Sequence, residues 1–548
     1  MRLYKLGSES LWYDELLQLD IAQGAWGSIL SQLPKHAGLP LDYWISHGWL
    51  WGGHSESWVR LPAVLVGTLT LPLAYQLGRS WLDRRTALLF TALLAFSPLH
   101  IRFSQEVRPY ALLLLGVMLA GYGLGRLRQT GRWRYLLPLQ VGGLIFGLAH
   151  FFALVIFLPW FLFTLGLALF ERKRRAAWRA LLALSATGLV LLLVLLTLGW
   201  GRTVWNVSWW GFGQAVVQTE RFSRPAEEKP NFGTGPELTE TFIKGSLLKP
   251  LGGGQSDSAL RLFNGLALLG LAYLLIRGRV ALGWLLSLWL ILPVVVVLAF
   301  LIQRGAFFEP RYIIMVLPAY LMLVAVGLLA LPRWLICAEP RGLATGVWVF
   351  LTGLVIISLV GPLHTYYREE NKENWRVVGQ LLAQNARPDD AVMAVNAESA
   401  LNWYYPPAQA APDQFETLAA VQARAATAER SWVVLSVYTS YIPEGQRVKT
   451  WLDEQGAVRF VVDPLIAVYY LGLTANPPQL LAEARHFALP VDHVLYAELA
   501  RQNRREPAIA RQYFELALAN APDEASRAGY QHEIEALPQS ARPITANQ

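Results

Sequence analysis

The chain has 548 residues, of which 54% are hydrophobic and 16% are charged, and its formal net charge is +8. Soluble globular proteins are about 45–50% apolar and about 25% charged, so the composition argues for a membrane protein. The positive charge does not indicate a nucleic-acid partner, because the Lys and Arg residues lie in short clusters between apolar runs. The single cysteine, Cys337, excludes an intrachain disulfide and a cysteine-rich metal site.

A short acidic motif lies near the amino terminus. Asp14 and Glu15 follow Trp12 and Tyr13 and precede an apolar, helix-like run over residues 16–22. A carboxylate held at a reacting centre suits the work of a general base. The alternative is structural, since acidic side chains in the first turn of a helix interact favourably with the helix dipole. One acidic pair is thin support for a divalent cation, so we predict no metal site here.

Ten apolar runs follow, each near the length of about 20 residues that a helix needs to cross a bilayer. They lie at 59–78, 86–101, 109–125, 135–149, 152–170, 180–199, 259–276, 280–302, 312–331 and 344–363. Basic clusters follow alternate runs, and the strongest is residues 171–175. The positive-inside rule therefore puts these loops in the cytoplasm and the remaining loops, with everything after residue 364, outside. We also expect one further helix before residue 1, because nothing else delivers the first 58 residues to the outer side.

Polar residues gather at the predicted outer ends of these spans. They are His100, Arg102, Gln105, Glu106, Arg108, Tyr110, His150 and Arg311. Ionisable groups at membrane depth are costly unless paired, so they mark function more often than chance would. The structural alternatives are that Glu106 and Arg108 pair to tie two helix ends together, that Arg311 snorkels to the headgroups, and that His150 is a polar turn residue.

A soluble tail follows Pro362. The pattern predicts a helix over 374–382, strands over 390–395, 432–436 and 458–462, and helices near 415–428 and 447–455. This alternation indicates a small α/β domain over residues 364–477. Over residues 478–548 the pattern becomes helical, and Ala510, Phe514, Ala517 and Pro522 have the spacing of half a tetratricopeptide-like repeat. One unit is too short for a solenoid, so we expect a hairpin that packs on the α/β domain.

The chain resembles the GT-C superfamily and, within it, glycosyltransferase family 39, the group of protein O-mannosyltransferases and aminoarabinose transferases. The resemblance covers about residues 3–400 and rests on the order and shared membrane side of several motifs: residues 10–15, 59–65, 97–100, 104–110, 149–152 and 310–312. It implies a polytopic helical transferase domain over residues 1–363. One departure is His36-Ala-Gly-Leu-Pro40, where relatives often carry His-Pro-Pro. This departure affects the acceptor contacts more than the donor site.

The resemblance also implies a polyprenyl-phosphate sugar as donor and a catalytic acidic residue in the first outer loop, a position that Asp14 matches. We predict transfer to a hydroxyl of a glycan, lipid or protein at the outer face of a bacterial inner membrane, with Asp14 as the base. Glu15 or Glu106 would orient the base or bind sugar hydroxyls. Arg102, Arg108 and Arg311 would bind the donor phosphate, and His100, Gln105, Tyr110 and His150 would bind substrate. No cofactor is predicted.

Two other functions compete with this one. A transporter or flippase of lipid-linked sugars would need a polar path through the membrane and broken helices near mid-bilayer. A membrane-anchored scaffold would act through its soluble tail, but the tail has no catalytic constellation. The charged clusters gather at one predicted face, which favours an interfacial transferase.

Overall fold

A computed structural model describes residues 1–198, 238–368, 372–472, 487, 497, 500–501, 507–519, 521 and 523–538, with internal gaps at 37, 171–173, 253–255, 305–307, 337–340, 396, 406–412, 415–416, 437–442 and 464–465. The chain forms two compact units. The larger comprises Met1–Glu9 and Leu17–Asn371, and the smaller comprises Ser10–Leu16 and Lys372–Gln548. The acidic motif at residues 10–15 therefore belongs to the smaller unit.

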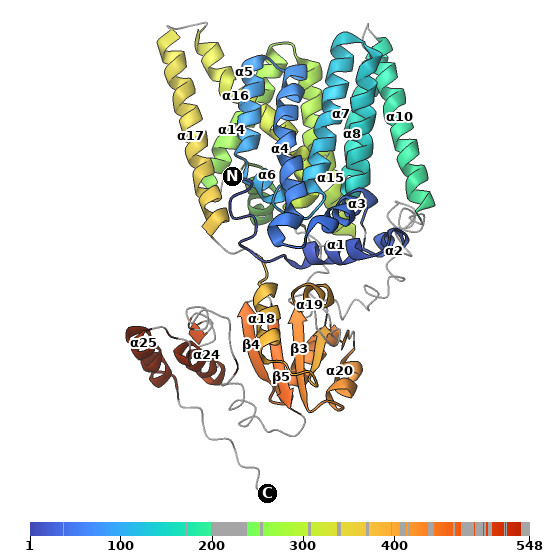
Figure 1. Ribbon diagram of the computed structural model, residues 1–548. Coiled ribbons are helices and arrows are strands. Elements are labelled where there is room, and N and C mark those ends of the chain that lie inside the picture. The colour runs from blue at the N-terminus through green and yellow to red at the C-terminus, as the bar shows by residue number, and fades with distance from the viewer. Residues whose placement is uncertain are drawn as a thin grey trace. The chain divides into compact units, whose positions relative to one another are not determined.

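The larger unit is a bundle of helices that run up and down in turn (Figure 1). Its long helices are α4 (Glu56–Trp81), α5 (Arg84–Ala95), α7 (Tyr110–Thr130), α8 (Leu136–Ala149), α9 (Phe157–Phe170), α10 (Arg174–Thr197), α14 (Asp257–Ile276), α15 (Val280–Arg304), α16 (Leu317–Ile336) and α17 (Arg341–Arg368). Short helical turns complete it: η1 (Leu33–His36), η2 (Leu50–Gly52), η3 (Trp133–Tyr135), α12 (Glu240–Phe242), η7 (Ile243–Leu248) and α13 (Lys249–Gly252).

Within the described ranges, eight helices are long and apolar enough to cross a membrane, judged by length and composition. They are Glu56–Trp81, Tyr110–Thr130, Phe151–Phe170, Arg175–Thr197, Asp257–Ile276, Val280–Gln303, Pro310–Ala330 and Gly346–Arg368. Eight of the ten predicted spans are thereby confirmed. The other two are shorter helices, α5 with 12 residues and α8 with 14 residues.

The predicted span over residues 86–101 is wrong as a single helix. Helix α5 ends at Ala95, and a separate short helix, α6 (Pro98–Phe103), follows it. A residue before proline disfavours the helical conformation, and Ser97 is extended, with ψ 119°. Its hydroxyl then accepts a hydrogen bond from the His100 amide as the N-cap of α6. The polar residues from His100 onward therefore lie on a short helix and a turn.

Helices α7 and α8 approach each other unusually closely because glycines face one another. An added Cβ at Gly116 would lie 2.6 Å from the Phe146 amide nitrogen, and one at Gly142 would lie 2.4 Å from that of Ala120. Small residues allow such backbone contact between membrane helices. This packing fixes the first residue of α7, Tyr110, relative to the residue that caps the end of α8, His150.

One end of the bundle carries several short elements (Figure 1). Helices α1 (Tyr13–Gln23), α2 (Trp26–Gln32) and α3 (Pro40–Trp49) precede α4, and α3 packs against both α4 and α8. The 3-10 helix η4 (Phe151–Ile156) leads into α9, and η8 (Pro310–Val316) leads into α16. Helices η4 and η8 are in contact. The candidate residues of the larger unit lie at this end.

The smaller unit contains a five-stranded sheet of order β2-β1-β3-β5-β4. Its strands are β1 (Ala391–Val395), β2 (Asp413–Gln414), β3 (Arg430–Ser436), β4 (Val458–Asp463) and β5 (Ile466–Gly472). Strand β1 is parallel to β2 and β3, whereas β5 is antiparallel to β3 and β4. The helices are α18 (Trp375–Asn385), α19 (Glu398–Tyr404), α20 (Leu418–Ala425) and α21 (Pro443–Glu454). The predicted strands and helices are present, but the sequence pattern did not predict β2, β5 or α19.

Two further helices, α24 (Pro507–Ala519) and α25 (Glu524–Glu535), pack against each other as a hairpin. Ala510, Phe514 and Ala517 are buried in its small core together with Tyr530 and Ile534. Pro522 of the repeat-like motif lies outside the described residues. The comparison with a tetratricopeptide-like repeat stays a prediction.

Candidate functional site

The two adjacent carboxylates of the acidic motif have different surroundings. Both lie in the first turn of α1, as the structural alternative expected. Glu15 is fully buried, and its Oε2 lies 3.2 Å from the Nζ of Lys372, whose side chain is 8% exposed. The Trp12 amide also donates to this oxygen, at 3.3 Å. Asp14 is only half-buried, so it is the more exposed carboxylate of the pair.

In the larger unit, the turn after α6 holds an ion pair. The Oε1 of Glu106, which is fully buried, lies 3.2 Å from the Nε of Arg102, which is 46% exposed. The two residues are one helical turn apart. The structural alternative predicted Arg108 as the partner of Glu106, but the partner at this oxygen is Arg102. The second oxygen of Glu106, Oε2, has no hydrogen-bond donor among the described residues.

Gln105 and His100 use their side chains to hold neighbouring segments. The Nε2 of Gln105 donates to the carbonyl oxygens of Arg2 and Tyr4, at 2.9 and 3.0 Å. The ring of His100 is buried between Thr70 Oγ1 and Arg2 Nη2, at 2.8 and 2.6 Å. These contacts are structural. A substrate-binding role for either residue stays a prediction.

A run of aromatic contacts connects Arg108 with Arg311. The Arg108 guanidinium lies 5.9 Å from the ring centre of Tyr110, which is 5.3 Å from the ring of His150. From there the contacts pass through Phe152 to Tyr312, and the Arg311 guanidinium lies 5.6 Å from the Tyr312 ring. The elements that supply these residues are the start of α7, the α8–η4 turn and η8. The structure thus brings together three predicted residues that are up to 203 positions apart (108 to 311).

The pKa of His150 depends on the charged groups around it. Burial and the positive charges of Arg108 and Arg311 lower the pKa of His150 to about 3, so the ring is neutral at physiological pH. Its Nδ1 accepts a hydrogen bond from the Phe152 amide at 3.2 Å. The proton of the neutral ring is therefore on Nε2, which makes this nitrogen an N–H donor.

Asp42 was not selected by the sequence analysis. It lies in the first turn of α3, and its Oδ2 accepts a hydrogen bond from the fully buried Gln18 of α1. The same Gln18 nitrogen donates to Ser46 Oγ at 3.1 Å. Burial raises the pKa of Asp42 to about 6, although the Gln18 hydrogen bond and the charge of Arg108 act to lower it. No motif marked Asp42, because its role depends on α3 packing close to Arg108.

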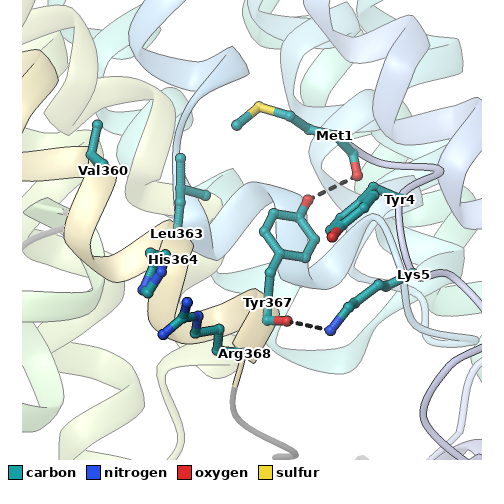
Figure 2. A pocket seen from close by; sticks show the side chains of 8 residues that line it. All are labelled: Met1, Tyr4, Lys5, Val360, Leu363, His364, Tyr367 and Arg368. Carbon is teal, nitrogen blue, oxygen red and sulfur yellow. Dashed lines mark hydrogen bonds between the residues drawn. The ribbon is translucent and has the colours of Figure 1, made fainter.

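A cavity of about 480 Å³ lies beside the C-terminal end of α17 (Figure 2). Met1, Val360 and Leu363 contribute apolar side chains, and Lys5 and Arg368 contribute positive charge. Hydrogen bonds from Lys5 Nζ to the Tyr367 carbonyl, 2.9 Å, and from the Tyr367 hydroxyl to the Met1 carbonyl, 2.8 Å, close one side. None of the described residues that line it is a predicted site residue or an acid. The cavity therefore suits the apolar part of a lipid better than a reacting centre.

Comparisons with known proteins address the family. A family model for dolichyl-phosphate-mannose-protein mannosyltransferase matches residues 36–200, which include Asp42, Arg108 and His150. Among curated proteins, none matches. Among solved structures, ArnT from Cupriavidus metallidurans bound to undecaprenyl phosphate has a TM-score of 0.51 at 12% identity, with 86% of this chain and 95% of that chain covered.

Two further solved structures resemble the chain. ArnT from the same organism in the apo state has a TM-score of 0.51 at 14% identity, with 87% of this chain and 97% of that chain covered. The oligosaccharyltransferase AglB from Archaeoglobus fulgidus, in complex with an inhibitory peptide and a dolichol-phosphate, has a TM-score of 0.50 at 10% identity, with coverage of 97% and 82%. At these identities the likeness concerns the fold, and it agrees with the predicted fold class. The family match covers residues 36–200, less than half of the chain, and agrees with this fold.

Proposed function

We propose that this chain is a membrane glycosyltransferase of the GT-C type, which moves a sugar from a polyprenyl-phosphate donor to an acceptor hydroxyl at the extracytoplasmic side of a bacterial inner membrane. The observation that carries the proposal is the pair of guanidinium groups, Arg108 and Arg311, whose positive charges both act on the neutral His150. The side of the membrane follows from the basic loops after alternate spans. The ligands of two of the similar structures, undecaprenyl phosphate and dolichol-phosphate, agree with such a donor.

In the proposed reaction the acceptor oxygen forms a bond to the anomeric carbon, and the bond from that carbon to the phosphate oxygen breaks. The lipid phosphate leaves with one more negative charge than it had in the donor. Arg108 and Arg311 stabilise this charge, since guanidinium groups grip phosphate oxygens well. The Nε2–H of His150 supplies a third donor. Arg102 contributes less, because it already pairs with Glu106.

Asp14 takes the proton of the acceptor hydroxyl. Its half-buried position leaves it accessible, whereas Glu15 is held by Lys372. Residues four apart on a helix share a face, so Asp14 and Gln18 are one turn apart on α1. Gln18 binds Asp42, and its Oε1 has no donor among the described residues. Asp42 and Gln18 therefore offer acceptors for sugar hydroxyls.

A transfer assay tests the proposal. The purified chain is incubated in lipid nanodiscs with radiolabelled polyprenyl-phosphate sugars and a membrane extract as acceptor source. We expect donor-dependent transfer or release of label by the wild type, and a loss of at least about 10²-fold in the Asp14→Asn variant, since general-base catalysis is typically worth 10²–10⁴-fold.

The matched control is Asp389→Asn, the same change at an exposed aspartate in the smaller unit. It should retain wild-type turnover. Equal activity in Asp14→Asn and wild type would move the base to Glu15 or Glu106. Donor binding without turnover for any donor, together with movement of labelled donor across the bilayer, would replace the transferase by the transporter alternative.

A further inference from the structure

The segment that carries the acidic motif is built into the start of the C-terminal unit. Ser10 Oγ donates to the Glu373 carbonyl at 2.5 Å and accepts from the Trp375 amide at 3.1 Å. The Tyr13 amide donates to Glu373 Oε2 at 2.9 Å. Glu373 and Trp375 thus bind Ser10, at the start of the motif, and Glu373 also binds Tyr13, which precedes Asp14. These partners are more than 350 positions apart in the sequence.

Glu373 is itself fixed from a second direction. It is 4% exposed, and its Oε2 also accepts from the indole nitrogen of the fully buried Trp375, at 2.5 Å. Helix α19 adds another contact, because the Tyr404 hydroxyl accepts a hydrogen bond from the Leu11 amide at 2.7 Å. Buried polar networks whose members are satisfied hold one arrangement of the chain. The first turn of α1 is therefore positioned by residues 372–404.

Lys372 and Glu15 form the charged contact of this network. Both side chains are buried, 8% and 0% exposed, and their charged atoms are 3.2 Å apart. Removing one partner of a buried ion pair leaves the other charge uncompensated, whereas replacing both is often tolerated. Comparing the single with the double replacement therefore distinguishes a residue that positions the loop from one that takes part in the chemistry.

We propose that Lys372 is a positioning residue for the transfer reaction: by neutralising Glu15 it holds the first turn of α1, and so Asp14, in its working place. The inference rests on the proposed function for the role of Asp14. It assigns Glu15 to the clamp and not to the chemistry. It also gives the C-terminal unit a part in catalysis, because the clamp consists of its first residues.

The test compares three variants in the transfer assay: Lys372→Met, Lys372→Arg and the double variant Lys372→Met/Glu15→Gln. Misplacing a catalytic group by about 1 Å can cost about 10²-fold, so we expect kcat to fall about 10- to 100-fold in Lys372→Met. Lys372→Arg restores the charge and should recover most of it. The double variant removes both charges and should be several-fold more active than Lys372→Met. Donor Kd should not change.

A second readout does not depend on turnover. Hydrogen exchange of the peptide over residues 10–16 reports on the Leu11 and Tyr13 amides, which are bonded to Tyr404 and Glu373. Exchange follows local opening, so it should be faster in Lys372→Met and near wild type in the double variant. Lys449→Met, the same change at an exposed lysine of α21, is the matched control and should change neither exchange nor kcat.

The outcomes separate this inference from the proposed function. Unchanged exchange and unchanged kcat in Lys372→Met would overturn the clamp while leaving Asp14 as the base. A double variant as inactive as Glu15→Gln alone, with native exchange in both, would make Glu15 a catalytic group and also overturn it. Failure of the proposed function itself would appear earlier, as full activity in Asp14→Asn. If Lys372→Met does not fold, kcat and hydrogen exchange of the double variant and of Lys372→Arg still test whether the ion pair positions Asp14.

Discussion

Two polar regions lie at the same end of the helix bundle, and they differ in which charged groups come together there. In the turn over residues 100–106, Glu106 pairs with Arg102, and Gln105 binds backbone carbonyls. Around His150, two groups of the same charge, Arg108 and Arg311, act on one neutral ring. Both cations act on the pKa of one histidine, so they share one neighbourhood. Polar density alone therefore does not locate a phosphate site, whereas two guanidinium groups near one ring supply the donors that a phosphate binds.

The largest expected effect tests the cationic region. Arg108→Gln and Arg311→Gln should each lower kcat by about 10²–10³-fold, the usual cost of removing one donor from a charge-stabilising site. Arg102→Gln should lower it less than about tenfold, because Arg102 is engaged by Glu106. Transfer rates of the three variants check this comparison. A loss in Arg102→Gln as large as in the other two would remove the distinction between the two regions.

The pKa of His150 tests the same arrangement of Arg108 and Arg311 without a measurement of turnover. The positive charges of Arg108 and Arg311 help to lower its pKa to about 3. Removing either guanidinium should therefore raise the pKa of His150, which NMR titration of a histidine-labelled sample measures. A His150 pKa that does not move in either variant would contradict the arrangement.

A smaller effect is expected at Asp42. Because its pKa is raised to about 6, activity that needs the carboxylate should rise as the pH increases through about 6. Asp42→Asn should lower kcat/KM about tenfold, of the order expected for one hydrogen bond to a charged group, and should remove this acid limb. An unchanged acid limb in the variant would assign it to another group.

The same carboxyl should make the folded protein less stable as the pH rises, whereas activity should increase. A raised pKa in the folded protein favours the protonated form, so the free energy of unfolding falls as the pH rises from about 4 to about 6, by on the order of 3 kcal/mol. The Asp42→Asn variant lacks this dependence. Thermal unfolding of both proteins in the same lipid at pH 4.5 and pH 7 measures the difference. Parallel shifts in both would show that Asp42 is not responsible.

The smallest effect on turnover is expected at Glu106. Glu106→Gln keeps an acceptor for Arg102 but loses the charge, and a hydrogen bond to a charged group contributes about 1.5–3 kcal/mol. We expect a lower Tm and kcat within about threefold of wild type. If instead kcat falls 100-fold or more at an unchanged Tm, Glu106 belongs to the chemistry, through the oxygen that has no donor among the described residues.

The sequence was a good guide to elements that depend on local pattern. Eight long apolar runs predicted spans, and the strands around residues 391–395 and 430–436 followed from short apolar segments between helices. It was a poor guide where a single residue redirects the chain. Pro98 splits a run that looked continuous. Strand β5 lies only two residues after β4 in numbering, so the pattern did not separate the two.

The sequence by itself determined the membrane class, the motifs and the residue types from which a phosphate site can be built. Only the tertiary structure decided which of them meet. Arg108, His150 and Arg311 come from three separate turns, and Asp42 gains its raised pKa from burial beside Gln18. Asp14 and Glu15 are neighbours in sequence, yet Lys372, 357 positions after Glu15, buries one of them in an ion pair. The physical reason is that charge balance and desolvation depend on distances through space, which the order of residues does not contain.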